Sequence, residues 1–260
     1  MIIVMGAALF FGSCAALDRF FFENTAYSLR LITLDLDRVL TREEALDATG
    51  LHEGGNIFSV DLGRVKAALL EFPQIESVCV ERKLPDQLSI SLIARKPVAW
   101  VAPDGETGDP SASEKSLLVD AGGFLMRPRH VLPEYFHLPA IYGVQSDNIS
   151  AGDILPGEDL RLALELIDRV AKNPNGRLRI RTLNISRGYC LEVVSDHNAH
   201  ILFGTDDFDG QLYRLQQLLV HCDESGRTLN TVNLMVKRNT PVTFVVAAVP
   251  SGGIGAEKKY

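Results

Sequence analysis

The chain has 260 residues, of which 46% are hydrophobic and 23% are charged, and its formal net charge is -7. This composition is typical of a globular protein with one or two domains that each bury a core, and it argues against disorder. The acidic balance and the lack of a basic run argue against nucleic acid as a partner, because phosphate contacts need clustered Lys and Arg.

The first 22 residues predict a membrane segment. Residues 2–17 carry no charged side chain, and three phenylalanines follow at 20–22. Together these stretches approach the roughly 20 apolar residues that a spanning helix needs. We therefore expect residues 1–22 to be an N-terminal membrane helix that anchors the chain. A cleaved secretory signal and a lipoprotein-type site at Cys14 are alternatives, and all three readings place the bulk of the chain outside the cytoplasm.

Residues 29–101 predict a small domain that begins with a strand and a helix. Residues 29–36 alternate as a half-buried strand does. Thr41 and Glu44 have the spacing of a capping box, so a helix should follow directly. Gly50 should end that helix near Thr49.

A second helix and a hairpin complete this domain. Asp61 is placed to cap the helix, and Pro73 to end it. The helix carries an apolar face at spacings of three and four. That face consists of Leu62, Val65, Leu69 and Phe72. Two alternating stretches on either side of Leu84-Pro85-Asp86 then predict a hairpin, whose Arg82 is interpreted as a solvated strand residue.

This β-α-α-β-β order and several motifs resemble a POTRA module of the type carried by the FtsQ/DivIB family of bacterial cell-division proteins. Asn56–Leu62 is similar to the family's G-N-[IL]-F-x-[VL]-[DN] segment. Pro73–Ile90 resembles its P-x-V-x-x-A-x-V-x-R-x-[LFW]-P-x-T-L-x-I stretch, and Arg95–Trp100 resembles its E-R-x-P-V-A ending. The resemblance continues beyond residue 115, into that family's β domain.

The rest of the chain predicts a mixed β-sheet domain with two helices over residues 115–249, so the fold class is α+β. A Gly- and Pro-rich surface loop at 102–115 precedes it, and a disordered tail at 250–260 follows it. Strands are expected at 117–125 around a Gly turn, 138–143, 178–185, 189–194, 199–203, 230–237 and 242–248. One helix is expected at about 158–173, with a stripe of Leu160, Leu164, Ile167 and Ala171, and another after Asp206–Asp209.

Groups with catalytic chemistry do not converge in the sequence. The cysteines form no CxxC, and we interpret most of them, including Cys79, as small buried residues; a Cys190–Cys222 disulfide is left open. His197 and His200 lack the further ligands that a zinc site needs. We expect no enzyme activity, no catalytic residue, no metal, no cofactor and no small-molecule substrate.

The family resemblance implies a non-enzymatic scaffold that passes once through the inner membrane and recruits and links division proteins at the septum by strand-edge binding. Its implied partners are FtsB (DivIC)-like and FtsL-like coiled-coil membrane proteins, together with other division proteins. By position, the implied contacts lie near the last strand edge, at Leu234, Met235, Val236, Val242 and Phe244. The alternatives are a POTRA-bearing secretion or outer-membrane assembly factor and an envelope enzyme.

Overall fold

A computed structural model describes residues 20–22, 24–103, 109–113, 115–144, 149–155, 157–173 and 176–245. Most of the expected membrane segment, part of the expected loop at 102–115 and the expected tail lie outside these residues. Among the described residues, no helix is both long enough and apolar enough to cross a bilayer.

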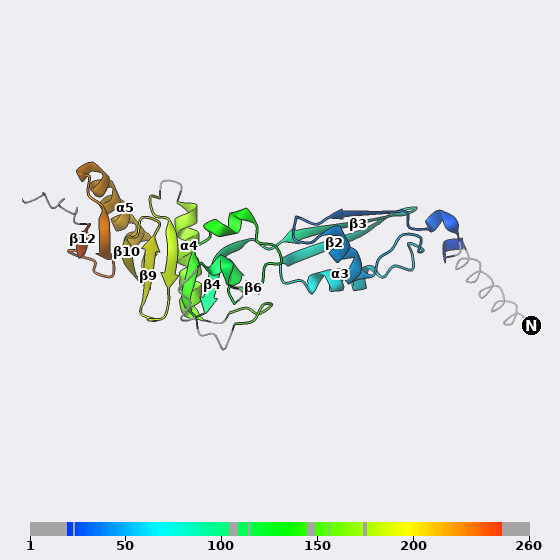
Figure 1. The fold of residues 1–260 in the computed structure, drawn as a ribbon, viewed down its shortest axis with the longest axis horizontal. Coiled ribbons are helices and arrows are strands. Elements are labelled where there is room, and N and C mark those ends of the chain that lie inside the picture. The colour runs from blue at the N-terminus through cyan, green and yellow to red at the C-terminus, as the bar shows by residue number, and fades with distance from the viewer. Residues whose placement is uncertain are drawn as a thin grey trace, which may run out of the picture. The chain divides into compact units, whose positions relative to one another are not determined.

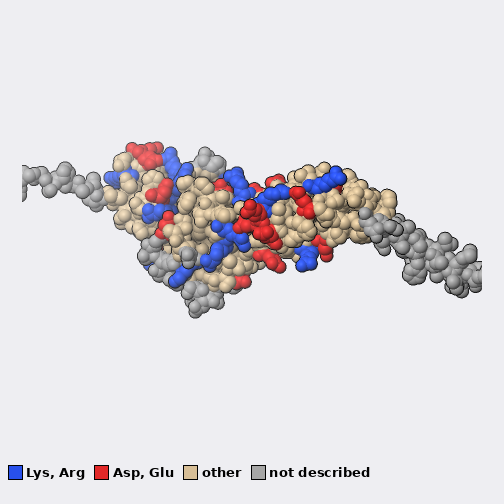
Figure 2. All heavy atoms as spheres, turned by 45° about the vertical axis from the view of Figure 1, so that its right-hand side comes forward, with Lys and Arg blue, Asp and Glu red and all other residues tan. Residues whose placement is uncertain are grey.

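The chain forms two compact units, and each is described by itself. Unit 1 comprises Met1–Pro97, Leu117–Phe136 and Ile149–Ile154, and unit 2 comprises Val98–Ser116, His137–Asn148 and Leu155–Tyr260. The sequence-based limits of 29–101 and 115–249 stay predictions. On the face drawn in Figure 2, positive and negative side chains are interspersed, without a continuous basic patch.

Unit 1 contains a small sheet with two helices (Figure 1). Its elements are η1 Thr25–Tyr27, β1 Leu31–Asp35, α2 Arg42–Thr49, α3 Leu62–Leu70, β2 Ile75–Lys83 and β3 Gln87–Ala94. The strand order is β1-β3-β2, with β1 parallel and β2 antiparallel to the central β3. The predicted β-α-α-β-β order is therefore confirmed. The short hairpin of β5 Leu117–Asp120 and β6 Leu125–Met126 also belongs to this unit.

Local signals set both helix starts in unit 1 and the end of α2, as predicted, whereas α3 ends at Leu70, before the predicted end at Pro73 and without Phe72. The Thr41 hydroxyl accepts the N–H of Glu44 at 3.2 Å, and the Glu44 carboxylate accepts the N–H of Thr41 at 2.8 Å. This reciprocal pair satisfies two donors that a helix start otherwise leaves free. Gly50 ends α2 with a φ of 65°, a conformation that glycine adopts without strain. Asp61 caps α3 by accepting two backbone N–H groups.

The core of unit 1 lies between the sheet and its helices, and burial of each large apolar side chain contributes about 1.5–3 kcal/mol. Its fully enclosed members include Ile32, Ile57, Leu69, Ile75, Leu88 and Ile90. Two predictions were wrong here. Cys79 is exposed because it lies on the opposite face of β2 from Val78. Arg82 is not simply solvated, because its guanidinium donates to the carbonyls of Ile57 and Val60.

Unit 2 is built on a larger sheet with the strand order β12-β11-β10-β9-β8-β7-β4 (Figure 1). Its elements are β4 Pro97–Pro103, η2 Pro110–Ala112, β7 Ala140–Val144, α4 Glu158–Lys172, β8 Ile180–Asn184, β9 Cys190–Ser195, β10 His200–Gly204, α5 Phe208–Ser225, β11 Leu229–Asn233 and β12 Val242–Phe244, with η3 Pro133–His137 before β7. The pairs β8–β9, β9–β10 and β11–β12 are antiparallel. The pairs β4–β7, β7–β8 and β10–β11 are parallel.

The two helices of unit 2 pack on this sheet, α4 against β8 and α5 against β10. Buried residues of α4 include Leu160, Leu164 and Ile167, as expected. Ala171 is exposed, so its predicted place in the apolar stripe was wrong; it lies in the last turn of the helix, beyond the last buried position.

Candidate protein-interaction site

Strand β12, the last strand of the larger sheet, forms an open edge of that sheet. Among the described residues, β12 pairs with β11 only. An edge strand of this kind presents backbone donors and acceptors that no neighbouring strand takes up. A register shift between Leu229 and Thr231 interrupts the pairing on the β11 side. We call the stretch Leu234–Val245, which contains β12 and the turn before it, the terminal edge.

The hydrogen-bond pattern shows which residues of β12 face outward. The carbonyl of Pro241 accepts an N–H from β11 at 3.0 Å, and the N–H of Val245 donates back to the residue before β11 at 2.8 Å. Residues along an antiparallel strand alternate between facing the partner strand and facing away from it. The backbone N–H and C=O groups of Val242 and Phe244 therefore point away from the sheet, where an added strand could pair with them.

The side chains of β12 divide between the two faces of the sheet. Val242 and Phe244 lie opposite the buried Val232 and Leu229, so both face the core and stay half-buried. The guanidinium of Arg227 lies over the Phe244 ring, 5.3 Å from its centroid, within the range of a cation–π contact. The ring of Phe244 is thus held between core and solvent, where a partner could contact it.

The five residues predicted to bind a partner are distributed unevenly over the terminal edge. Met235 and Val236 are 40% and 39% exposed, and Val242 and Phe244 keep part of their surface. Leu234 is 1% exposed, so its side chain supports the edge from inside the unit. The structure therefore brings four of the five to the surface at one edge of the sheet.

The turn before β12 begins earlier than predicted. The expected strands at 230–237 and 242–248 are in fact Leu229–Asn233 and Val242–Phe244. The Asn233 side chain accepts the N–H of Met235 at 3.0 Å, which starts a turn of the kind that Asn favours. Arg214 on α5 then donates to the Leu234 carbonyl at 2.9 Å and fixes the turn. The role of Arg214 was missed, because a contact across 20 residues leaves no local signal.

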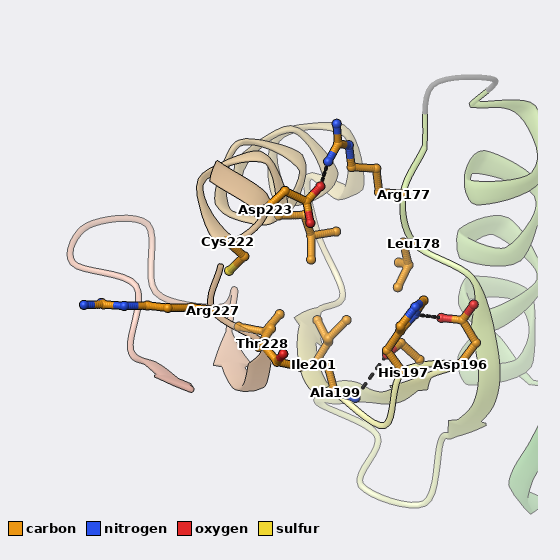
Figure 3. Close-up of a pocket in the computed structure, with 13 residues that line it drawn as sticks. Arg177, Leu178, Asp196, His197, Ala199, Ile201, Cys222, Asp223, Arg227 and Thr228 are labelled. Atoms are coloured by element: carbon orange, nitrogen blue, oxygen red, sulfur yellow. Dashed lines mark hydrogen bonds and ion pairs between the residues drawn. The ribbon is translucent and has the colours of Figure 1, made fainter. Parts of the chain in front are cut away.

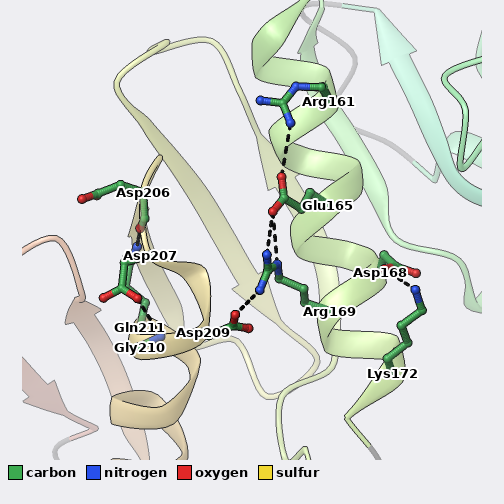
Figure 4. Close-up of polar contacts among 10 residues, drawn as sticks. All are labelled: Arg161, Glu165, Asp168, Arg169, Lys172, Asp206, Asp207, Asp209, Gly210 and Gln211. Carbon is green, nitrogen blue, oxygen red and sulfur yellow. Dashed lines mark hydrogen bonds and ion pairs between the residues drawn. The ribbon is translucent and has the colours of Figure 1, made fainter.

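Helix α5 is held to the sheet by a buried glutamine (Figure 4). Gln211 is 2% exposed, accepts the N–H of Gly204 at 2.7 Å, and donates to the carbonyls of Gly204 and Asp206. This role of Gln211 was not predicted from the sequence. Because α5 also carries Arg214, the Gln211 contacts position the residue that fixes the turn.

An ion-pair chain on the surface of unit 2 links α4 to the start of α5 (Figure 4). Arg169 pairs with Glu165 at 2.9 Å and with Asp209. The hydrogen bond from Arg169 holds the pKa of the Asp209 carboxyl below its usual range. Such exposed pairs contribute little free energy, so they orient the helices rather than create a reactive site.

A groove of about 450 Å³ lies between the end of α5 and the β9–β10 turn (Figure 3). It brings Asp196, His197 and Cys222 to one place, and His197 Nδ1 lies 2.6 Å from an Asp196 oxygen. Burial raises the pKa of the Cys222 thiol and outweighs the opposing effect of Arg227. This thiol is therefore kept protonated, whereas a catalytic cysteine needs a lowered pKa.

The remaining candidate chemistry also fails to converge. Cys190 and Cys222 are both buried free thiols, so the disulfide left open by the sequence does not form. His197 and His200 are both exposed, and His197 bonds to Asp196. Within the described ranges, no group of three or more His, Cys, Asp and Glu side chains could hold a metal ion.

Comparison with known proteins gives a consistent picture. Residues 28–93 match the family model described as POTRA domain, FtsQ-type. The chain is 23% identical over 183 residues to Cell division protein DivIB of Clostridium acetobutylicum, covering 70% of this chain and 68% of the relative. It is 28% identical over 204 residues to Cell division protein FtsQ of Syntrophotalea carbinolica, covering 76% and 67%. It is 24% identical over 237 residues to Cell division protein FtsQ of Geotalea daltonii, covering 89% and 82%.

Proposed function

Because the chain belongs to the FtsQ/DivIB family of cell-division proteins, we propose that it acts at the division site as a non-enzymatic scaffold that captures other division proteins by strand pairing. The open edge of β12 is the observation that carries this proposal. A strand added there would gain backbone hydrogen bonds without displacing any strand of the described sheet.

The terminal edge divides recognition between backbone and side chains. The outward N–H and C=O groups of Val242 and Phe244 hold any extended segment, whatever its sequence. The Phe244 ring, the Arg227 guanidinium above it and the exposed Met235 add contacts that depend on the partner's side chains. The partners proposed from the family resemblance are FtsB (DivIC)-like and FtsL-like membrane proteins.

The proposed location is the inner membrane, with the described units outside the cytoplasm. The support is the uncharged stretch at residues 2–17, which lies outside the described residues. The absence of enzyme activity is likewise proposed. It is supported by the thiol of Cys222, which stays protonated, and by the ring of His197, which bonds to Asp196.

A photo-crosslinking experiment tests the proposed edge. A photoactivatable phenylalanine analogue replaces Phe244 in living cells, and adducts are identified by mass. Tyr189 is the matched control, because it is an aromatic residue 63% exposed in the turn between β8 and β9, away from β12. We expect adducts with a small coiled-coil membrane protein from position 244 and none from position 189. The same adducts from both positions, or none from position 244, would contradict edge capture.

Two substitutions separate backbone pairing from side-chain contact. Val242→Pro removes an outward N–H while sparing the hydrogen bonds to β11, because proline is tolerated where its missing N–H faces away from the sheet. Phe244→Lys removes the aromatic contact. Both should abolish capture in a chain that remains folded by circular dichroism. Retention of the partner by the Val242→Pro variant would show that backbone pairing is not used.

A further inference from the structure

The motif Asn56-Ile57-Phe58 contacts the first described residues of the chain. Residues 20–22 are helical, and the Asn56 amide donates to the carbonyls of Phe21 at 2.7 Å and Phe22 at 3.0 Å. Such carbonyls at a helix end lack intrahelical partners. The Asn56 oxygen meanwhile accepts the N–H of Phe58 at 2.8 Å. One side chain thus ties a loop of unit 1 to the stretch that follows the uncharged N-terminus.

Aromatic rings reinforce this attachment. The Phe58 ring lies 5.2 Å from that of Phe21, 6.4 Å from that of Phe22 and 5.0 Å from that of Tyr27. Phe20 joins through Phe21, with ring centroids 5.2 Å apart. Edge-to-face pairs at these distances are mutually attractive. We call Asn56, Phe58, Tyr27 and Phe20–Phe22 the aromatic clamp.

The clamp rests on a rigid part of unit 1. The N–H of Ile57 donates to the Tyr27 carbonyl at 2.9 Å, and that of Leu29 donates to the Gly55 carbonyl at 2.7 Å. Ile57 itself is fully buried. Arg82 on β2 adds its hydrogen bonds to the carbonyls on either side of Phe58. The backbone that carries Asn56 and Phe58 is therefore held to the rest of unit 1.

Two rings of the clamp remain open to solvent. Phe20 is 56% exposed and Phe22 is 51% exposed. The residues of the clamp carry no charge, and the charged residues nearest to Phe20–Phe22 in the sequence are Asp18, Arg19 and Glu23. Residues 2–17 also lack charge, and Asp18 and Arg19 lie between this stretch and Phe20. Helices that lie in the interface between a bilayer and water bury Phe, Trp and Leu side chains there and keep their charged residues toward the water.

We propose that the aromatic clamp is a lipid-binding surface, which inserts Phe20 and Phe22 into the bilayer interface and holds unit 1 against the membrane. This proposal rests on the proposed membrane anchor and adds a second function to it. The anchor determines that the chain is bound, and the clamp determines how unit 1 lies on the bilayer.

Fluorescence from the full chain in phosphatidylcholine liposomes tests this. Phe22→Trp and Phe58→Trp place one probe on each side of the clamp. Ile93→Trp is the matched control, because Ile93 is 57% exposed and lies near one end of β3. Gln87, which pairs with Leu31 at the start of β1, lies at the other end of that strand. The native Trp100 is 3% exposed, so its emission can be subtracted using the unsubstituted chain.

Lipids brominated on the acyl chain should quench the probes at 22 and 58 several-fold more than the probe at 93. Aqueous acrylamide should give the opposite order. Adding Asn56→Ala should leave the probe at 22 near lipid, because the anchor still holds it, but should cause the probe at 58 to lose most of its lipid quenching.

Three results would overturn the proposal. If the chain floats with the liposomes but acrylamide reaches position 58 as readily as position 93, the anchor stands and the clamp does not bind lipid. If both probes are shielded from acrylamide without quenching by brominated lipid, a protein surface or a second copy covers them. If the chain does not float with the liposomes, the anchor and the clamp fail together.

Discussion

Replacing Arg82 with alanine should loosen the loop that carries Asn56 and Phe58. Arg82 Nε donates to the Ile57 carbonyl at 3.0 Å, and a terminal nitrogen donates to the Val60 carbonyl. Hydrogen bonds from a charged donor contribute about 1.5–3 kcal/mol each. Arg82 is half exposed, so water can replace part of this stabilisation. We expect Arg82→Ala to lower the free energy of opening the loop by about 2–4 kcal/mol.

Native-state hydrogen exchange on the intact chain, resolved by peptide, measures this loss without unfolding unit 2. At about 1.4 kcal/mol per tenfold, the backbone amides of residues 57–60 should exchange about 30- to 700-fold faster. Arg82→Lys keeps the charge but not the planar fork, so it should lie between the native chain and Arg82→Ala.

Lys83→Ala is the matched control, because Lys83 is the adjacent, exposed cation on β2. Exchange in residues 57–60 should be unchanged in this variant. If Arg82→Ala and Lys83→Ala give the same exchange rates, the loop is held by its packing and the reasoning from the fork is wrong.

Two further predictions concern pH. Gln211→Glu places a buried carboxyl against the carbonyl of Gly204. This raises the pKa of the new carboxyl in the folded chain above its unfolded value of about 4.3. The variant should therefore be most stable below that pH and lose stability as pH rises through the raised pKa. Its urea midpoint should fall between pH 5 and pH 7 more than that of the native chain, and a parallel response would refute this. The pKa of Glu44 is lowered, chiefly by the Thr41 N–H and further by Arg129. The contribution of Glu44 to stability is present above the ordinary carboxyl pKa and is lost as pH falls through the lowered pKa. Thermal midpoints of the native chain and of Glu44→Gln should therefore differ at pH 7 and converge in acid. A difference that stays constant with pH would argue against this role of Glu44.

Features with local causes could be predicted from the sequence. Helix α2 has its expected limits because Thr41, Glu44 and Gly50 act within one turn of the backbone. The strands of unit 1 follow from alternation, since the side-chain period identifies the buried face directly. Both kinds of signal lie within a few residues of the feature that they define.

Features with distant causes could not be predicted. Strand β11 ends earlier than expected, where Arg214 on α5 donates to the Leu234 carbonyl. Arg82 looked solvated because its acceptors lie more than 20 residues earlier in the chain. At the candidate site, the position of the edge follows the sequence pattern. The burial of Leu234 and the contact of Arg227 with Phe244 depend on how α5 packs.

The small size of β12 bears on how an open sheet edge avoids aggregation. Long, flat edge strands invite copies of the same chain to stack without limit. Here the edge strand covers only Val242–Phe244, follows a proline that has no N–H, and faces a register shift in its neighbour. A short segment from a partner fits these few groups, whereas a continuing fibril would need a longer and more regular template. The short length of β12 limits the number of hydrogen bonds to one partner, and it also protects the chain from polymerising with itself.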